Sequence, residues 1–136
     1  MRLTLAILLP PLAGLVAFGV IWLAPYLTGA AEPGKGLSLG SLFAAWAIPV
    51  YPLALVLGLP VLAAALLAPR WAGIVTLAGM LGVYVLTFFL IGVAWVGVAN
   101  LLGGTAQWLA LGAATVVHTL AYLLLRPARL VGRRTP

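Results

Sequence analysis

The sequence predicts an all-α membrane protein in which four transmembrane helices form an antiparallel up-down bundle, with the N and C termini both cytoplasmic. Three observations support this fold. The chain has 136 residues, 65% of them hydrophobic, with only seven Lys or Arg residues and one acidic residue. A soluble domain carries about a quarter charged residues, so the solvent of this chain must be lipid. Four apolar stretches follow one another, and the positive charges gather at one end of them.

Each apolar stretch is long enough to cross a bilayer, which takes roughly 20 helical residues. We expect helices because an open strand in lipid leaves its backbone groups unpaired, and because barrel strands alternate in polarity. The first stretch is also longer than the core of a signal peptide, about 7–15 residues, so we expect it to be retained as a helix. The expected single membrane domain, 1–136, contains helices at 3–28, 41–67, 71–99 and 105–125 and a basic tail at 126–136.

Short connections join these helices. The first, 29–40, contains glycines, a proline and mixed charge, and the second is the tight Ala68-Pro69-Arg70 turn. The third, 100–104, ends in two glycines, which terminate helices, and Thr105 is a favourable first cap of the fourth helix. Because such connections are short, consecutive helices should lie side by side and antiparallel.

The distribution of positive charge predicts the orientation, because Lys and Arg are retained on the cytoplasmic side. In a four-span chain Lys35 lies outside, balanced by Glu32. The arginines fall on the other side, at Arg2, Arg70, Arg126, Arg129, Arg133 and Arg134. Aromatic residues near the helix ends match interfacial belts, with Trp22, Tyr26, Trp95 and Trp108 outside and Trp71 and Tyr122 inside. We expect a multi-pass protein of a bacterial inner membrane, where small proteins have loops this short.

Composition excludes several classes of function. The chain has no cysteine, which excludes disulfides, thiolate metal sites and thiol nucleophiles. Its one acidic residue, Glu32, cannot supply paired carboxylates or complete a Ser-His-Asp arrangement. One histidine cannot give haem two imidazole ligands. The net charge of +6 comes without a polar surface that reads nucleic acid. We therefore expect no enzyme activity, no cofactor, no metal and no nucleic-acid partner.

His118 is the most polar titratable group inside a predicted span. Helical spacing places it on a stripe with Gln107, Ala110, Ala114 and Tyr122, flanked by Thr115 and Thr119. A polar group in hydrocarbon needs a partner, so this stripe should face protein or a wet cavity. One interpretation is a polar site or conduit formed by His118, Thr115, Tyr122, Gln107 and Asn100. The other, which we favour, is a neutral histidine hydrogen-bonded across helices or to Thr115.

The second and third helices carry two further predictions. Pro49, Pro52 and Pro60 each remove a backbone hydrogen bond, so we expect a kinked second helix. These prolines are either a functional hinge or simply reflect the higher frequency of proline in membrane helices. In the third helix, Ala78 and Gly82 form a pair of small residues four apart, which lets two helix backbones approach closely. The sequence leaves open whether this pair packs within the bundle or at a subunit contact.

The arginines of the tail have two interpretations. They attract anionic lipid headgroups, at roughly 1 kcal/mol per charge near the surface, or they only determine topology. The residues concerned are Arg126, Arg129, Arg133 and Arg134.

Three functional hypotheses remain. The first is a non-catalytic accessory or assembly subunit that packs against another membrane protein or against itself as a homo-oligomer. The second is a small homo-oligomeric channel or carrier with a conduit near His118 and the kinked second helix. The third is an enzyme subunit that contacts quinone or lipid through His118 and Tyr122. We rank them in this order because the spans contain so few polar residues.

Overall fold

The computed structural model describes residues 2–29, 38–94 and 105–126. These residues form four helices and, within those ranges, no strand. The helices are α1 (Arg2–Leu27), α2 (Leu39–Leu67), α3 (Ala72–Ala94) and α4 (Thr105–Leu125). Each is long and apolar enough to span a membrane. The predicted all-helical fold with four helices of membrane-spanning length and apolarity is therefore confirmed, while the expected continuation of the third helix over 95–99 lies outside the described residues.

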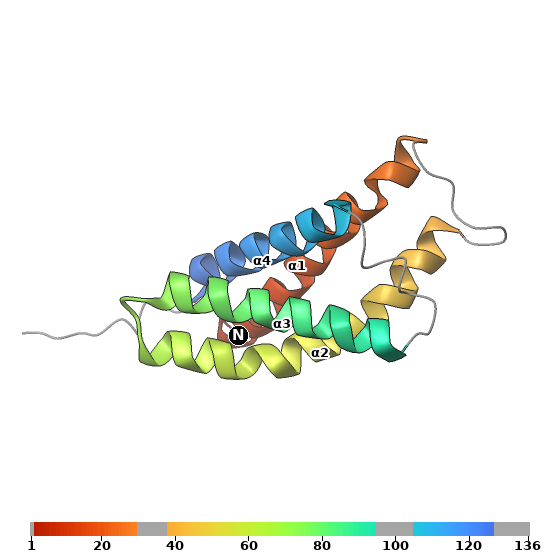
Figure 1. The fold of residues 1–136 in the computed structure, drawn as a ribbon. Coiled ribbons are helices and arrows are strands. Elements are labelled where there is room, and N and C mark those ends of the chain that lie inside the picture. The colour runs from red at the N-terminus through yellow and green to blue at the C-terminus, as the bar shows by residue number, and fades with distance from the viewer. Residues whose placement is uncertain (1, 30–37, 95–104, 127–136) are drawn as a thin grey trace, which may run out of the picture.

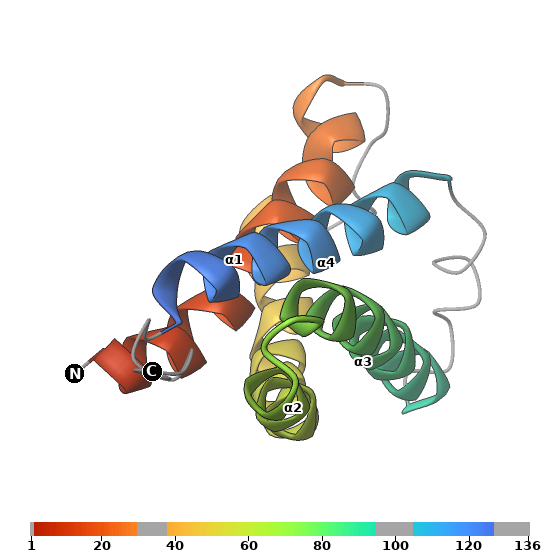
Figure 2. The same ribbon diagram turned by 90° about the vertical axis from the view of Figure 1, so that its left-hand side faces the viewer.

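Each helix packs mainly against two others in a four-membered ring, and weaker contacts join the remaining pairs. α1 contacts α4 most extensively, α2 contacts α3, and the α3–α4 and α1–α2 contacts join the two pairs. Figure 1 shows these pairs as two layers, and Figure 2 shows α1 and α4 crossing each other. The helices spread apart toward the end where α1 finishes and α2 begins.

Local chemistry determines where α1 ends. Gly29 has a φ of 73°, a left-handed conformation that glycine adopts without a steric penalty. The Thr28 hydroxyl donates to the carbonyl of Ala24 at 2.9 Å, which satisfies one of the last carbonyls of the helix. Gly29 therefore ends α1 and begins the first connection, which the sequence showed to be rich in glycine.

The turn between α2 and α3 is as tight as expected. Pro69 disfavours continuation of α2 because it has no N–H to donate and its ring crowds the preceding turn. The Trp71 backbone N–H donates to the carbonyl of Ala68 at 3.0 Å, which closes the turn. The carbonyl of Trp71 then accepts from Val75 at 2.8 Å, so α3 begins directly after Trp71.

α2 remains helical through all three of its prolines. Figure 1 shows that it changes direction between its first and second halves, as helices do at proline. Pro49 is half-buried, whereas Pro52 and Pro60 are exposed. The bend agrees with the sequence, and a hinge motion at these prolines stays a prediction.

Aromatic side chains of α1 and α3 form the centre of the core. The ring centroids of Phe18 and Phe88 lie 6.4 Å apart, and those of Phe18 and Trp22 lie 6.0 Å apart. Trp22 is only 8% exposed and packs in the core, so the expected interfacial belt stays a prediction. Trp71 and Trp108 are exposed, as belt residues must be. Position near a helix end does not determine which face of the helix a residue occupies.

Close packing of α2 on α3 depends on Gly79. A Cβ atom at Gly79 would lie 2.5 Å from Cγ1 of Val61, closer than real Cβ contacts. By contrast, Ala78 and Gly82 are exposed, and a Cβ at Gly82 would meet nothing within 4 Å. The predicted small-residue pair therefore does not pack within the described bundle, and its subunit contact stays a prediction.

This difference predicts opposite effects of one methyl group on the same helix. Gly79→Ala should destabilise the protein by about 1–3 kcal/mol, because α2 and α3 must move apart. Gly82→Ala should be neutral or stabilise by up to about 1 kcal/mol, because alanine favours the helix and space is open. Thermal unfolding of both variants in detergent checks this, and equal midpoints would contradict the α2–α3 packing described.

Candidate functional site

The polar stripe predicted on α4 faces the interior of the bundle. Ala110, Ala114, His118 and Tyr122 are all buried, with His118 and both alanines at 0% exposure. The opposite face of α4 exposes Trp108, Leu109, Val116, Leu120 and Leu124. Gln107 lies in the first turn of α4 but its side chain is outside the described part, as is Asn100 entirely. The central part of the predicted stripe therefore lies on the buried face of α4.

His118 is hydrogen-bonded across helices to Tyr84 of α3. The Tyr84 Oη and His118 Nδ1 atoms lie 3.0 Å apart, and the two rings meet edge to face with centroids 5.8 Å apart. In one imidazole tautomer the tyrosine hydroxyl donates to Nδ1, and in the other Nδ1–H donates to Oη. Both side chains are fully enclosed. The bond joins α3 to α4 without requiring a charge.

Sequence reasoning missed Tyr84. A signal was present, because tyrosine normally occupies the interface of a span, where its hydroxyl reaches water. Tyr84 instead lies in the middle of α3, where its hydroxyl needs a partner inside the protein. The expectation of an interhelical partner for His118 therefore agrees with the structure, although the residue that supplies it was not identified.

Gly14 of α1 provides the space for this pair. A Cβ atom at Gly14 would collide with the Tyr84 hydroxyl and lie 3.0 Å from the carbonyl oxygen of Ala114. The tyrosine ring therefore reaches from α3 to the surface of α1 while it bonds α4. Three helices meet at this one hydroxyl, so any side chain at Gly14 displaces it.

Thr115 is not the partner of His118. Its hydroxyl donates to the carbonyl of Leu111 at 2.8 Å, one turn earlier in the same helix. Thr119 likewise donates to the carbonyl of Thr115 at 2.8 Å. Both threonines satisfy their hydroxyls within α4, a common way to bury threonine in a helix. They line the interior without forming a side-chain network with His118.

Four buried polar atoms have no hydrogen-bond partner among the described residues. They are His118 Nε2, Tyr122 Oη, and the hydroxyl oxygens of Thr76 and Thr87. Leaving such a group unpaired costs about 1–3 kcal/mol, so these atoms mark where the interior is least satisfied. Tyr122 packs with Leu62, Ala65 and Ala72 in a second cluster of the core. The four atoms are therefore carried by α3 and α4 and are spread along the length of these helices.

The chemistry of this interior is limited. Across the described residues no three His, Cys, Asp or Glu side chains gather as a metal-ligand set. The one acidic residue of the chain, Glu32, lies outside the described part. At the end of α4, Arg126 is half-buried, and its backbone N–H donates to the carbonyl of Tyr122 at 2.8 Å. Arg129, Arg133 and Arg134 lie outside the described residues. The Tyr84–His118 pair is thus the best-defined polar feature of the spans.

The pair predicts a measurable coupling. Tyr84→Phe strands His118 Nδ1, and His118→Leu strands the Tyr84 hydroxyl, so each should destabilise the fold by about 0.5–2 kcal/mol. The double variant removes both partners and should cost less than the sum of the two. His118→Gln offers a donor and an acceptor and should be milder than His118→Leu. Unfolding free energies in mixed micelles give the cycle, and additive costs would show that the bond contributes nothing.

Comparison with known proteins does not assign this chain to a family. A scan against protein-family models, a search of curated proteins and a search of solved structures each find no match. The contacts, burial and charges of the four helices are therefore the basis for any function.

Proposed function

We propose that this chain is a non-catalytic accessory or assembly subunit, which acts by packing its helices against those of another membrane protein or of a second copy. One observation carries this proposal. His118 and Tyr84 are sealed inside the bundle and bonded to each other. A group that binds substrate or conducts ions needs contact with a path through the protein, whereas this pair only joins two helices. What the described helices offer outward is mostly aliphatic surface.

The outer face of α3 is the proposed contact. Ala78 and Gly82 are exposed there between the large exposed side chains of Leu77, Leu81 and Leu86. Lipid tails are as apolar as leucine, so helices associate in membranes through close packing at small residues. The open space over Gly82 supports this, because a neighbouring helix can approach its backbone directly.

The proposed topology is an antiparallel up-down bundle with cytoplasmic termini. The order of the contacts supports it: Gly19 of α1 meets Phe43 of α2, while Tyr51, further along α2, bonds the carbonyl of Leu8, earlier in α1. The contacts of α3 with α4 also run in opposite directions along the two helices: Gly73 approaches Leu123, whereas Tyr84, later in α3, bonds His118, earlier in α4. The arginines support the orientation through cytoplasmic retention, and we propose a bacterial inner membrane as the location.

Introduced cysteines test the topology, since the native chain has none. Lys35→Cys should react with a membrane-impermeant maleimide added outside, and Arg70→Cys should react only when the reagent reaches the cytoplasmic side. Both positions flank spans rather than lie in them, so folding is preserved. Labelling of Lys35→Cys from the cytoplasmic side alone would falsify the orientation.

Bulky substitutions on the outer face of α3 test the assembly role. Ala78→Leu and Gly82→Leu should weaken association with a partner or second copy at least about five-fold, because overpacking costs about 1–3 kcal/mol. The unfolding midpoint of the monomer should stay unchanged. Ala63→Leu, at an exposed alanine of α2, is the matched control. Crosslinking in native membranes and size-exclusion chromatography in mild detergent measure assembly, and an unchanged complex in both test variants contradicts the proposed face.

A small homo-oligomeric channel or carrier is the second candidate. The four unpartnered buried polar atoms and the bend of α2 favour it, because polar interiors and broken helices line transport paths. Proteoliposome flux, measured between about pH 5 and 8, separates the two candidates. Flux that His118→Gln alters while stability is kept supports the carrier. Absence of flux in a folded, assembled sample supports the accessory subunit.

A further inference from the structure

One nitrogen of the His118 ring has no partner in the described bundle. The Tyr84 hydroxyl bonds Nδ1, whereas Nε2 is buried and bonds no atom of the described residues. The side chain of His118 is 0% exposed and lies about two turns before the end of α4, so neither lipid nor bulk water touches it. Hydrocarbon offers no hydrogen bond either, so Nε2 needs a partner that is enclosed with it.

Counting donors and acceptors favours one tautomer of the ring. If Nδ1 carries the proton, it donates to Tyr84 Oη, which leaves the tyrosine O–H without an acceptor and Nε2 without a donor. If Nε2 carries the proton, the tyrosine O–H donates to Nδ1 over the 3.0 Å contact, and only the Nε2–H is unpaired. The Tyr84 hydroxyl has no other partner among residues 2–29, 38–94 and 105–126. One unpaired group costs less free energy than two, so the count places the proton on Nε2.

Two hydroxyls near His118 are buried and unpaired in the same way. Tyr122 follows His118 by one turn on the same face of α4, and long side chains in helices lean back toward the preceding turn. Thr76 stands opposite on α3, one turn after Ala72, which packs in one cluster with Tyr122, and two turns before Tyr84. Neither the Tyr122 Oη nor the Thr76 Oγ1 bonds any atom in the described part. The three polar atoms therefore share the stretch of the α3–α4 contact between the Ala72 cluster and the Tyr84–His118 bond.

We propose that these three groups bind ordered water enclosed between α3 and α4. The His118 Nε2–H donates to the water, and the hydroxyls of Thr76 and Tyr122 are its other partners. A buried water makes about three hydrogen bonds to groups that the protein leaves unpaired, which is the number available here. A buried ion would need an opposite charge beside it, and neither α3 nor α4 contains an acidic or basic residue other than this neutral histidine.

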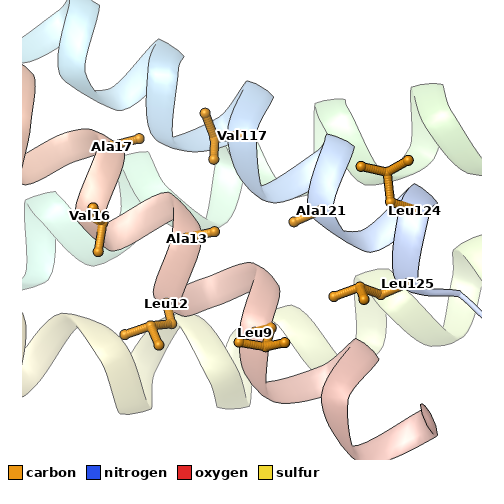
Figure 3. Close-up of a pocket in the computed structure, with 9 residues that line it drawn as sticks. All are labelled: Leu9, Leu12, Ala13, Val16, Ala17, Val117, Ala121, Leu124 and Leu125. Atoms are coloured by element: carbon orange, nitrogen blue, oxygen red, sulfur yellow. The ribbon is translucent and has the colours of Figure 1, made fainter.

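The other side of α4 offers nothing that binds water. An apolar groove with a volume of about 650 Å³ runs there between α1 and α4, lined from Leu9 to Ala17 and from Val117 to Leu125. Figure 3 shows that its nine side chains contain carbon only. The polar face of α4 is turned toward α3 instead. Because the water lies inside the bundle and not on the outer face of α3, it is bound whether or not that face assembles with a partner.

A high-resolution crystal structure of the wild type in a lipidic mesophase tests the proposal, together with ¹⁵N NMR of the His118 ring in bilayers. We expect density for water within hydrogen-bond distance of Nε2 and of at least one of the two hydroxyls, and ¹⁵N shifts of a ring protonated at Nε2. Density without water at Nε2, or a proton on Nδ1, overturns the proposal. A file of waters that continues to a membrane surface overturns the enclosed site and supports the carrier instead.

Matched threonine variants test which hydroxyl holds the water. Thr76→Val keeps the shape of the side chain but removes a partner, so the occupancy of the water should fall by about half or more. Thr87→Val is the control, because its hydroxyl is also buried and unpaired among the described residues but lies beyond Tyr84, toward the other end of α3. The control should leave the water at His118 unchanged. Equal loss in both variants contradicts the site, and the wild-type measurements decide the proposal if a variant does not fold.

Discussion

Hydrocarbon offers no hydrogen bonds, and the arrangement of this bundle follows from that constraint. A histidine and a tyrosine placed within spans must find partners inside the protein, and here they find each other across α3 and α4. Because the bond has a defined length and direction, it fixes how these two helices are aligned. It also reaches the third helix, since the Tyr84 hydroxyl lies over Gly14 of α1. One polar contact thus orients three of the four helices.

Small residues are the second consequence of a lipid solvent. Apolar surface gains little by leaving lipid for protein, so helices hold together where their backbones come close. Three glycines do this at three different contacts: Gly14 against Tyr84, Gly19 against Phe43 and Gly79 against Val61. In each case a large side chain occupies the volume that a Cβ would take. Small residues left on the outside, on α3 and in the α1–α4 groove, are the places where something else can fit closely.

The sequence by itself determined the architecture at the level of helices. The limits of the helices agree with the apolar stretches to within two residues wherever both ends are described, and the fourth, 105–125, agrees at both ends. This works because the signals are local: bilayer thickness sets the length, and Gly29 and Pro69 set the ends. Helical periodicity also predicted that His118 shares a buried face with Ala110 and Ala114. The helical repeat of 3.6 residues can be followed in the sequence of one helix, without the positions of the other helices.

Tertiary structure alone decided which faces meet. Tyr84 as the partner of His118, Trp22 in the core and Gly79 rather than Gly82 at the α2–α3 contact all depend on how each helix is rotated about its axis. In a soluble protein the polar face reveals that rotation, but a helix that is apolar all round gives no such signal. Rotation is set by shape complementarity and by a few hydrogen bonds between residues far apart in the chain. These interactions form only when the four helices pack together.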